Sequence, residues 1–144
     1  MMEQQAPAQS LEFDLPELLA FMRDAQSPVC YSDGMQGIGL RRHGVLVAAM
    51  VYEHFNGRNI WCHIAAVPGR HWLTRYALLA CLSYPFKVCG VERMTAQVMA
   101  SNRDAIRFVE HVGFVEEARL RGAASDGGDV ILFVLWKKDC RYVV

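Results

Sequence analysis

His63 is the side chain of this sequence best suited to accept a proton near neutral pH, because histidine titrates at about pH 6.5. It stands in an apolar stretch where the alternation of a strand places Trp61, Ala65 and Val67 on the same face. A histidine satisfied by hydrogen bonds in the core is the competing interpretation. Glu53, in the preceding apolar stretch, is the second candidate base. A water relay that uses neither side chain is the third alternative.

A second group of residues could bind an anion. Arg70, Thr74 and Arg75 follow Pro68-Gly69, where a helix is expected to begin. Backbone N–H groups that open a helix attract negative charge, and arginine donates forked hydrogen bonds, so this segment could hold phosphate. Two arginines at a helix start oppose the helix dipole, and a bound anion would remove that cost. The competing interpretation is a solvated first turn.

The cysteines and histidines show no metal-binding pattern. Five cysteines occur without close pairing, which predicts reduced thiols in a cytosolic protein. Cys62 and His63 are adjacent and His54 precedes them, but this spacing matches no common zinc site. We therefore expect no metal ion.

The composition is that of a globular domain. The chain has 144 residues, of which 53% are hydrophobic, 15 are basic and 15 are acidic. This balance argues against a protein that coats nucleic acid. No apolar run approaches the ~18 residues that span a bilayer. Residues 1–10 are polar and lack the order of a secretion signal, so we expect a flexible tail there and one cytoplasmic domain over residues 11–144.

The first half of the chain predicts a helix followed by an antiparallel meander. Residues 11–25 have apolar side chains spaced for one helix face, and Pro16 suits the first turn. Strands are expected over 37–42, 45–55 and 59–67. The turn between the last two strands contains Asn-Gly, a strong hairpin signal.

The second half predicts a helix over 70–87, a strand over 91–99, a helix over 103–112 and strands over 114–121 and 130–136. A strand, a helix and a strand in that order typically form a right-handed parallel crossover. The predicted fold class is α/β (α+β), with a mixed, largely antiparallel central sheet and helices on both faces.

The segment from Asn102 to Phe114 resembles the signature of the GNAT acetyltransferase family. In that family the segment begins with Asn, carries Ala three residues later, usually contains Tyr and ends on Gly-Phe. Here Asn102, Ala105 and Gly113-Phe114 match, and Val109 replaces Tyr. Each matching residue could also have only a structural role, as a helix cap, a helix stop or core. The resemblance covers roughly residues 36–138 and extends to short acetyltransferase-like proteins of bacterial viruses.

The resemblance implies that acetyl-CoA is bound between a splayed strand and two helices. The family has glycines where this chain has Leu73 and Arg75, so arginine side chains would supplement the backbone in binding pyrophosphate. The implied contacts come from the strand end, the helix start and the later helix: Ala65, Ala66, Val67, Arg70, His71, Trp72, Leu73, Thr74, Arg75, Asn102 and Phe108.

The implied activity is transfer of an acetyl group to an amine of a small molecule or a protein, with His63 or Glu53 as the base. Val109 cannot act as the family's usual general acid, but a thiol pKa of about 8.5 makes the departing thiolate a tolerable leaving group. The alternative is a catalytically degraded domain that binds CoA or a partner, such as a viral accessory protein in a host cytoplasm. No nucleic-acid or membrane partner is expected, and a homodimer is left open.

Overall fold

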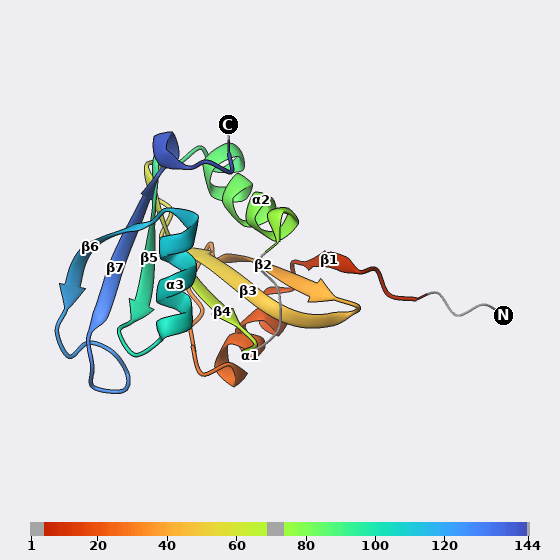
Figure 1. Cartoon of the computed structure of the whole chain (residues 1–144), viewed down its shortest axis with the longest axis horizontal. Helices are drawn as coiled ribbons and strands as arrows, with labels where there is room; N and C mark the ends of the chain where they lie inside the picture. The colour runs from red at the N-terminus through yellow and green to blue at the C-terminus, as the bar shows by residue number, and fades with distance from the viewer. Residues whose placement is uncertain (1–4, 69–73, 144) are drawn as a thin grey trace.

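A single mixed sheet forms the centre of the computed structural model, which describes residues 5–68 and 74–143. Its seven strands lie in the order β1-β2-β3-β4-β5-β7-β6, and all neighbours are antiparallel except β4 and β5 (Figure 1). The strands are β1 (Gln9–Glu12), β2 (Gln36–Arg42), β3 (Val45–Glu53), β4 (Asn59–Ala66), β5 (Arg93–Met99), β6 (Val115–Leu120) and β7 (Val130–Trp136).

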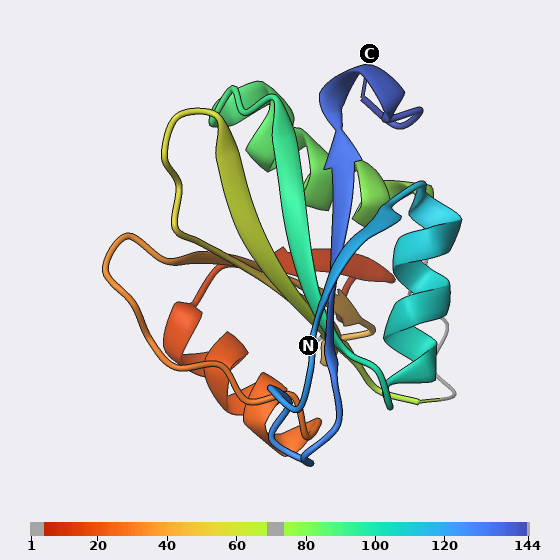
Figure 2. The ribbon, with the colours of Figure 1, turned by 90° about the vertical axis from the view of Figure 1, so that its left-hand side faces the viewer.

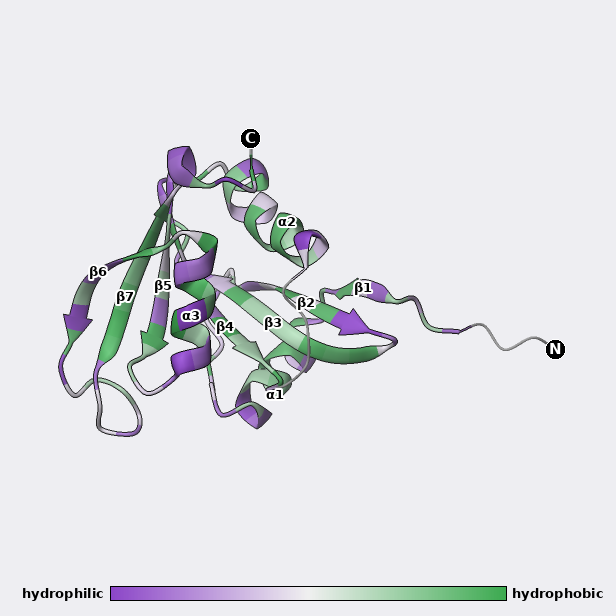
Figure 3. Ribbon diagram, viewed as in Figure 1, coloured by the Kyte–Doolittle hydropathy of each residue, from purple (hydrophilic) through white to green (hydrophobic). Residues whose placement is uncertain are grey.

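Helices cover both faces of this sheet, as the sequence predicts (Figure 2). On one face α1 (Leu15–Asp24) packs Leu18 and Met22 against β3 and β4. The larger core lies on the other face, under α2 (Arg75–Ser83) and α3 (Arg103–Val112). Two short helical segments, a π-helix over Tyr84–Val88 and a 3-10 turn over Lys137–Asp139, complete the fold. Apolar residues fill β7 and polar ones alternate along α3 (Figure 3).

The first strand was not predicted. The chain over Gln9–Glu12 pairs with β2 through Leu11 and Leu40, so it belongs neither to a tail nor to a helix. The apolar spacing that indicates a helix from residue 11 holds only from Leu15, because the backbone at Asp14 is extended and Pro16 lies in the first turn of the helix. Two predictions are therefore wrong: the tail does not extend through residue 10, and the helix does not begin at residue 11. Both overlook the short edge strand β1.

The meander of β2, β3 and β4 is confirmed, with the β3–β4 connection at Asn56-Gly57. The Asn56 side chain accepts hydrogen bonds from the N–H groups of Arg58 and Asn59, and β3 ends at Glu53 rather than at Phe55. Gly39 of β2 allows α1 to approach, because a Cβ there would lie 2.5 Å from Leu18 Cδ2.

The β4–α2–β5 unit is a parallel crossover, as predicted. The predicted helix over 70–87 is observed from Arg75, and residues 69–73 lie outside the described part of the chain. Pro85 coincides with a change from α-helix to π-helix at Tyr84. The predicted strands at 91–99 and 114–121 are shorter by one or two residues at their ends.

Candidate active site

The two parallel strands separate before either of them ends. Their pairing runs from Asn59 and Arg93 to Cys62 and Ala96, yet β4 continues to Ala66 and β5 to Met99. Figure 1 shows the two arrowheads apart, with α3 in front of the gap. A gap of this kind leaves backbone groups of β4 without the strand partner that they would otherwise have.

The direction of those backbone groups follows from the pairing with β3. The N–H of Val67 donates to the carbonyl oxygen of Val47 at 2.9 Å, so odd-numbered residues of this strand direct their N–H groups to β3. The N–H groups of Ile64 and Ala66 therefore face the gap. Of the two alanines expected to contact acetyl-CoA, Ala66 directs its N–H into the gap, whereas the N–H of Ala65 points to β3.

A cavity of about 290 Å³ occupies the gap, and we call it the cleft. The strand end contributes Ile64, Ala65 and Ala66 to its lining. Asn102 and Phe108 of the α3 region form the opposite wall. Four of the residues expected to contact acetyl-CoA thus border one cavity: Ala65, Ala66, Asn102 and Phe108.

A second cavity of about 350 Å³ adjoins the cleft, and we call it the side cavity. The two share Ser27, Ile64, Met99, Asn102 and Ala105 in their linings. A molecule in the cleft and a molecule in the side cavity would therefore meet at these shared walls.

Both candidate bases, Glu53 and His63, line the side cavity and touch each other. The Nε2 atom of His63 contacts Oε2 of Glu53. Oε1 of Glu53 accepts a hydrogen bond from the Ser32 hydroxyl at 3.2 Å and lies 2.7 Å from Nε2 of His54. Glu53 is 8% exposed, so its carboxylate is held by these donors rather than by bulk water.

Sheet geometry explains why these side chains meet. Glu53 lies opposite Trp61 and Val51 lies opposite His63, so Glu53 and His63 are diagonal neighbours on the α1 side of the sheet. Diagonal neighbours are close enough for long side chains to touch. Because Nε2 donates to the carboxylate, the other ring nitrogen of a neutral His63 carries the lone pair.

Burial lowers the pKa of His63 below its ordinary value, and the Glu53 carboxylate opposes that shift. The imidazole is therefore neutral at physiological pH and able to accept a proton. The sequence left open whether His63 is a base or a core histidine. Its side chain is 17% exposed, contacts Glu53 and borders the side cavity.

The anion site expected at the start of α2 is described only in part. Arg70, His71, Trp72 and Leu73 lie outside the described residues. Thr74 caps the helix by accepting from the N–H of Ala77 at 3.1 Å, and its hydroxyl donates to Gln9 at 2.8 Å.

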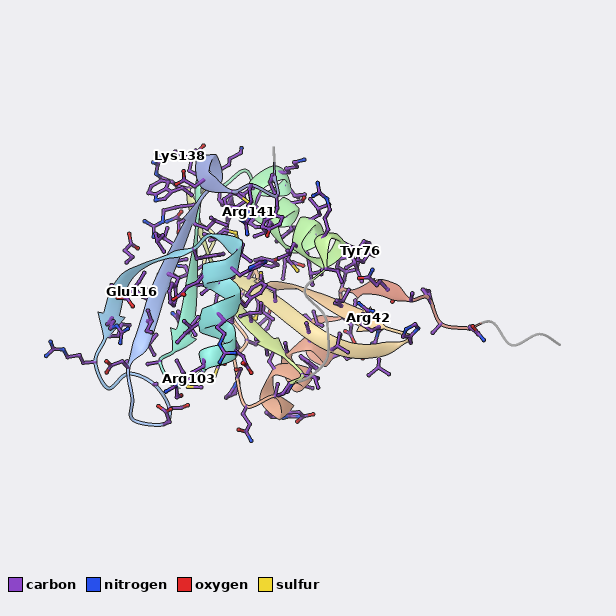
Figure 4. All side chains as sticks on the ribbon, in the orientation of Figure 1. Arg42, Tyr76, Arg103, Glu116, Lys138 and Arg141 are labelled. Carbon is purple, nitrogen blue, oxygen red and sulfur yellow. The ribbon has the colours of Figure 1, made fainter. Side chains whose placement is uncertain are left out.

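Because Thr74 Oγ1 already accepts and donates, the described donors left for an anion are the first amides of α2 and the exposed Arg75 side chain. Figure 4 marks Tyr76 in this first turn.

The residues of the family signature have structural roles in this chain. The Asn102 side chain accepts from the N–H of Ala105 at 3.1 Å and caps α3. Gly113 ends the helix with φ +118°, a conformation that favours glycine, and Phe114 is buried. Val109 is 1% exposed in the core, so no group at the usual Tyr position reaches the cleft.

Sequence reasoning missed several parts of the site. Ser32 stands in a loop without periodicity, and nothing in its neighbours indicates that it reaches Glu53. Ala123 to Ser125, in the β6–β7 loop, line the side cavity and show no local signal either. The sequence analysis weighs His54 only as a metal ligand, although its position directly after Glu53 indicates that it lies near the candidate base.

Within residues 5–68 and 74–143, no cluster of His, Cys, Asp or Glu is arranged to hold a metal ion, and no helix is long and apolar enough to cross a membrane.

No protein-family model and no curated protein matches the sequence. Solved structures do resemble it. A spermidine N-acetyltransferase from Vibrio cholerae, described as dodecameric, is 16% identical with a TM-score of 0.71, over 91% of this chain and 95% of that one. The spermidine/spermine N-acetyltransferase SpeG of the same organism, in complex with manganese ions, is 15% identical with a TM-score of 0.70, over 90% and 92%. The expected GNAT fold is thereby confirmed.

Proposed function

We propose that this chain transfers the acetyl group of acetyl-CoA to an amine. The observation that carries the proposal is the contact between His63 and Glu53 in a cavity that adjoins the gap between β4 and β5. A proton acceptor there would stand beside the place where a thioester could lie along β4. The fold shared with N-acetyltransferases supports the same activity.

Acetyl-CoA would supply an activated acyl group as a thioester. The residues present fit it, because the gap leaves N–H groups of Ile64 and Ala66 directed at its interior. Such donors stabilise negative charge that develops on a carbonyl oxygen. The first turn of α2, with Arg75, is the described part of the proposed pyrophosphate site. The contacts expected from residues 70–73 remain part of this proposal.

The amine would enter from the side cavity and lose a proton to His63. In the balanced reaction the amine nitrogen forms a bond to the carbonyl carbon, and the carbon–sulfur bond breaks with its electron pair remaining on sulfur. The proton passes to the free ring nitrogen of His63, and Glu53 stabilises the resulting positive charge through Nε2. No side chain is required to protonate the sulfur, because a thiolate leaves readily near neutral pH.

A domain that binds CoA without catalysis is the second candidate function, and the buried Val109 favours it. The two functions differ in turnover. Incubating the full chain with acetyl-CoA, with and without a panel of primary amines, and detecting N-acetylated product by mass spectrometry separates them. We expect amine-dependent product in the wild type. CoA binding without product for any amine would favour the binding domain.

The setting of the protein is also a proposal. We propose a cytoplasmic enzyme whose partners are acetyl-CoA and its acceptor. Cys30, Cys62, Cys81, Cys89 and Cys140 form no disulfide with one another, which agrees with this compartment. A homodimer remains a prediction, which sedimentation of the full chain would test.

A further inference from the structure

We infer that the acceptor carries a single amino group on a small apolar body and is not a polyamine. The inference rests on the proposed acetyl transfer and names the substrate class of the same site. It follows from the charges that face the side cavity, from the size of that cavity and from the loop that closes it.

Acidic groups are scarce around the side cavity. Among the described residues that line it, Glu53 is the one acid, and no lysine or arginine occurs. The remaining lining is neutral, and its larger apolar members are Met22, Val29, Ile64, Val98, Met99 and Val130. A ligand with several positive charges would leave water for walls that offer almost no compensating charge.

The single carboxylate of the side cavity is already engaged. Glu53 accepts from Ser32 and contacts the imidazoles of His54 and His63. An incoming ammonium group would have to share this carboxylate with three donors. One amino group can do so briefly, since it gives up its proton to react, but a second or third would find no such partner.

The loop between β6 and β7 closes the cavity with small residues. Ala124 is 8% exposed, and Ala123 and Ser125 flank it in the lining. The two acidic side chains of this loop, Asp126 and Asp129, accept hydrogen bonds from groups outside the side cavity lining. Asp126 accepts from the Ser101 hydroxyl at 2.6 Å and from the N–H of Gly128 at 2.9 Å.

Asp129, at the end of the same loop, accepts from the N–H of Gly122 at 3.1 Å. Both loop carboxylates thus accept hydrogen bonds from their own loop or from Ser101, and neither of them is among the residues that line the side cavity. The volume of the side cavity, about 350 Å³, is near the lower end of ligand pockets, which span roughly 300–1,000 Å³. A short apolar amine suits both properties.

A matched pair of amines tests the inference. Hexylamine and 1,6-diaminohexane have the same length and differ in one terminal ammonium group, and spermidine serves as the polycationic probe. With saturating acetyl-CoA, we expect kcat/KM for hexylamine to exceed that for either polycation by about tenfold or more. Equal values, or a preference for the diamine or spermidine, would overturn the inference.

A variant makes the test specific to the side cavity. Gln97 lines the cavity, and Gln97→Glu adds one acid there without changing the size of the side chain. The ratio of kcat/KM for the diamine to that for hexylamine should rise by about tenfold. Gln36→Glu adds the same charge at an exposed position of β2 outside both cavities, so its ratio should stay that of the wild type.

The possible outcomes separate the inference from the proposed function. Acetylation of spermidine in preference to hexylamine would reject the substrate class and keep acetyl transfer. An unchanged amine ratio in Gln97→Glu would show that the acceptor does not occupy the side cavity, and would also reject the inference. Absence of product with every amine would contradict acetyl transfer itself, and the inference would fall with it.

Discussion

At the scale of single residues, the contact between His63 and Glu53 joins two neighbouring strands, β4 and the end of β3, at the wall of the side cavity. Neither residue would have the same properties alone. Burial favours the neutral imidazole, while the carboxylate orients it and would stabilise the imidazolium formed during the reaction.

His63→Gln should reduce kcat by about 10²-fold or more, because proton transfer typically contributes that much. Glutamine keeps the size of the side chain and a hydrogen bond to Glu53 but cannot accept the proton. The affinity for CoA should remain near that of the wild type. In the wild type, kcat/KM should fall as the pH falls through the lowered pKa of His63, below about 6.5. If His63→Gln keeps both the activity and this acidic limb, His63 is a core histidine and Glu53 or a water relay is the base.

The same residue affects stability. Because the pKa of His63 is lower in the folded than in the unfolded chain, the unfolded state binds more protons over the interval between the two values. The contribution of neutral His63 to the unfolding free energy is complete above about pH 6.5. It is lost as the pH falls toward the pKa that His63 has in the folded chain. Denaturant titrations should show the unfolding free energy of the wild type declining in that window more steeply than that of His63→Gln. Parallel curves would mean that His63 titrates alike in both states.

At the scale of elements, α1 approaches β2 closely enough that glycine is needed beneath it. A Cβ at Gly39 would lie 2.5 Å from Leu18 and 2.7 Å from Leu46. Gly39→Ala should therefore lower the unfolding free energy by about 1–3 kcal/mol. Leu18→Ala removes one of the clashing side chains, so the double variant should lose less stability than the sum of the two single ones. Additive losses in denaturant titrations would mean that the two residues do not compete for the same space.

The first turn of α2 belongs to the same scale. Arg75 is exposed beside the first amides of that helix, where we propose that pyrophosphate binds. Arg75→Ala should weaken CoA binding by roughly 1.5–3 kcal/mol, as loss of a charge-assisted hydrogen bond does. Arg107→Ala removes another exposed arginine, on α3, and serves as the charge-matched control for calorimetric titration. Equal affinities of the two variants would assign Arg75 to plain surface.

At the scale of the whole molecule, most of the sheet could be predicted from local patterns. The strands of the meander, of the parallel crossover and of the final antiparallel pair each stood out as a local run of residues, and Asn56-Gly57 marked the turn between β3 and β4. The edge strand at Gln9–Glu12 could not be predicted from local patterns, because its pairing with β2 is long-range and Leu11 also fits the apolar spacing of α1.

The candidate site, like the sheet, could be predicted from the sequence only in part. His63 and Glu53 were identifiable because their chemistry is rare in apolar strands. Their contact, and the parts of the wall from Ser32 and Ala124, depend on tertiary packing that no local spacing encodes. The signature at Asn102 and Gly113 pointed to the right fold through residues whose observed role is to cap one helix.

The central claim about the whole molecule is that the gap between β4 and β5 holds CoA. The melting temperature of the full chain, measured with increasing CoA, tests it most directly, because a ligand that binds only the folded state stabilises it by RT ln(1 + [L]/Kd). At about a hundred times Kd this amounts to roughly 2.7 kcal/mol, a shift of several degrees for a domain of this size. We predict a shift that grows with the logarithm of the CoA concentration. An unchanged melting temperature at millimolar CoA would contradict the account.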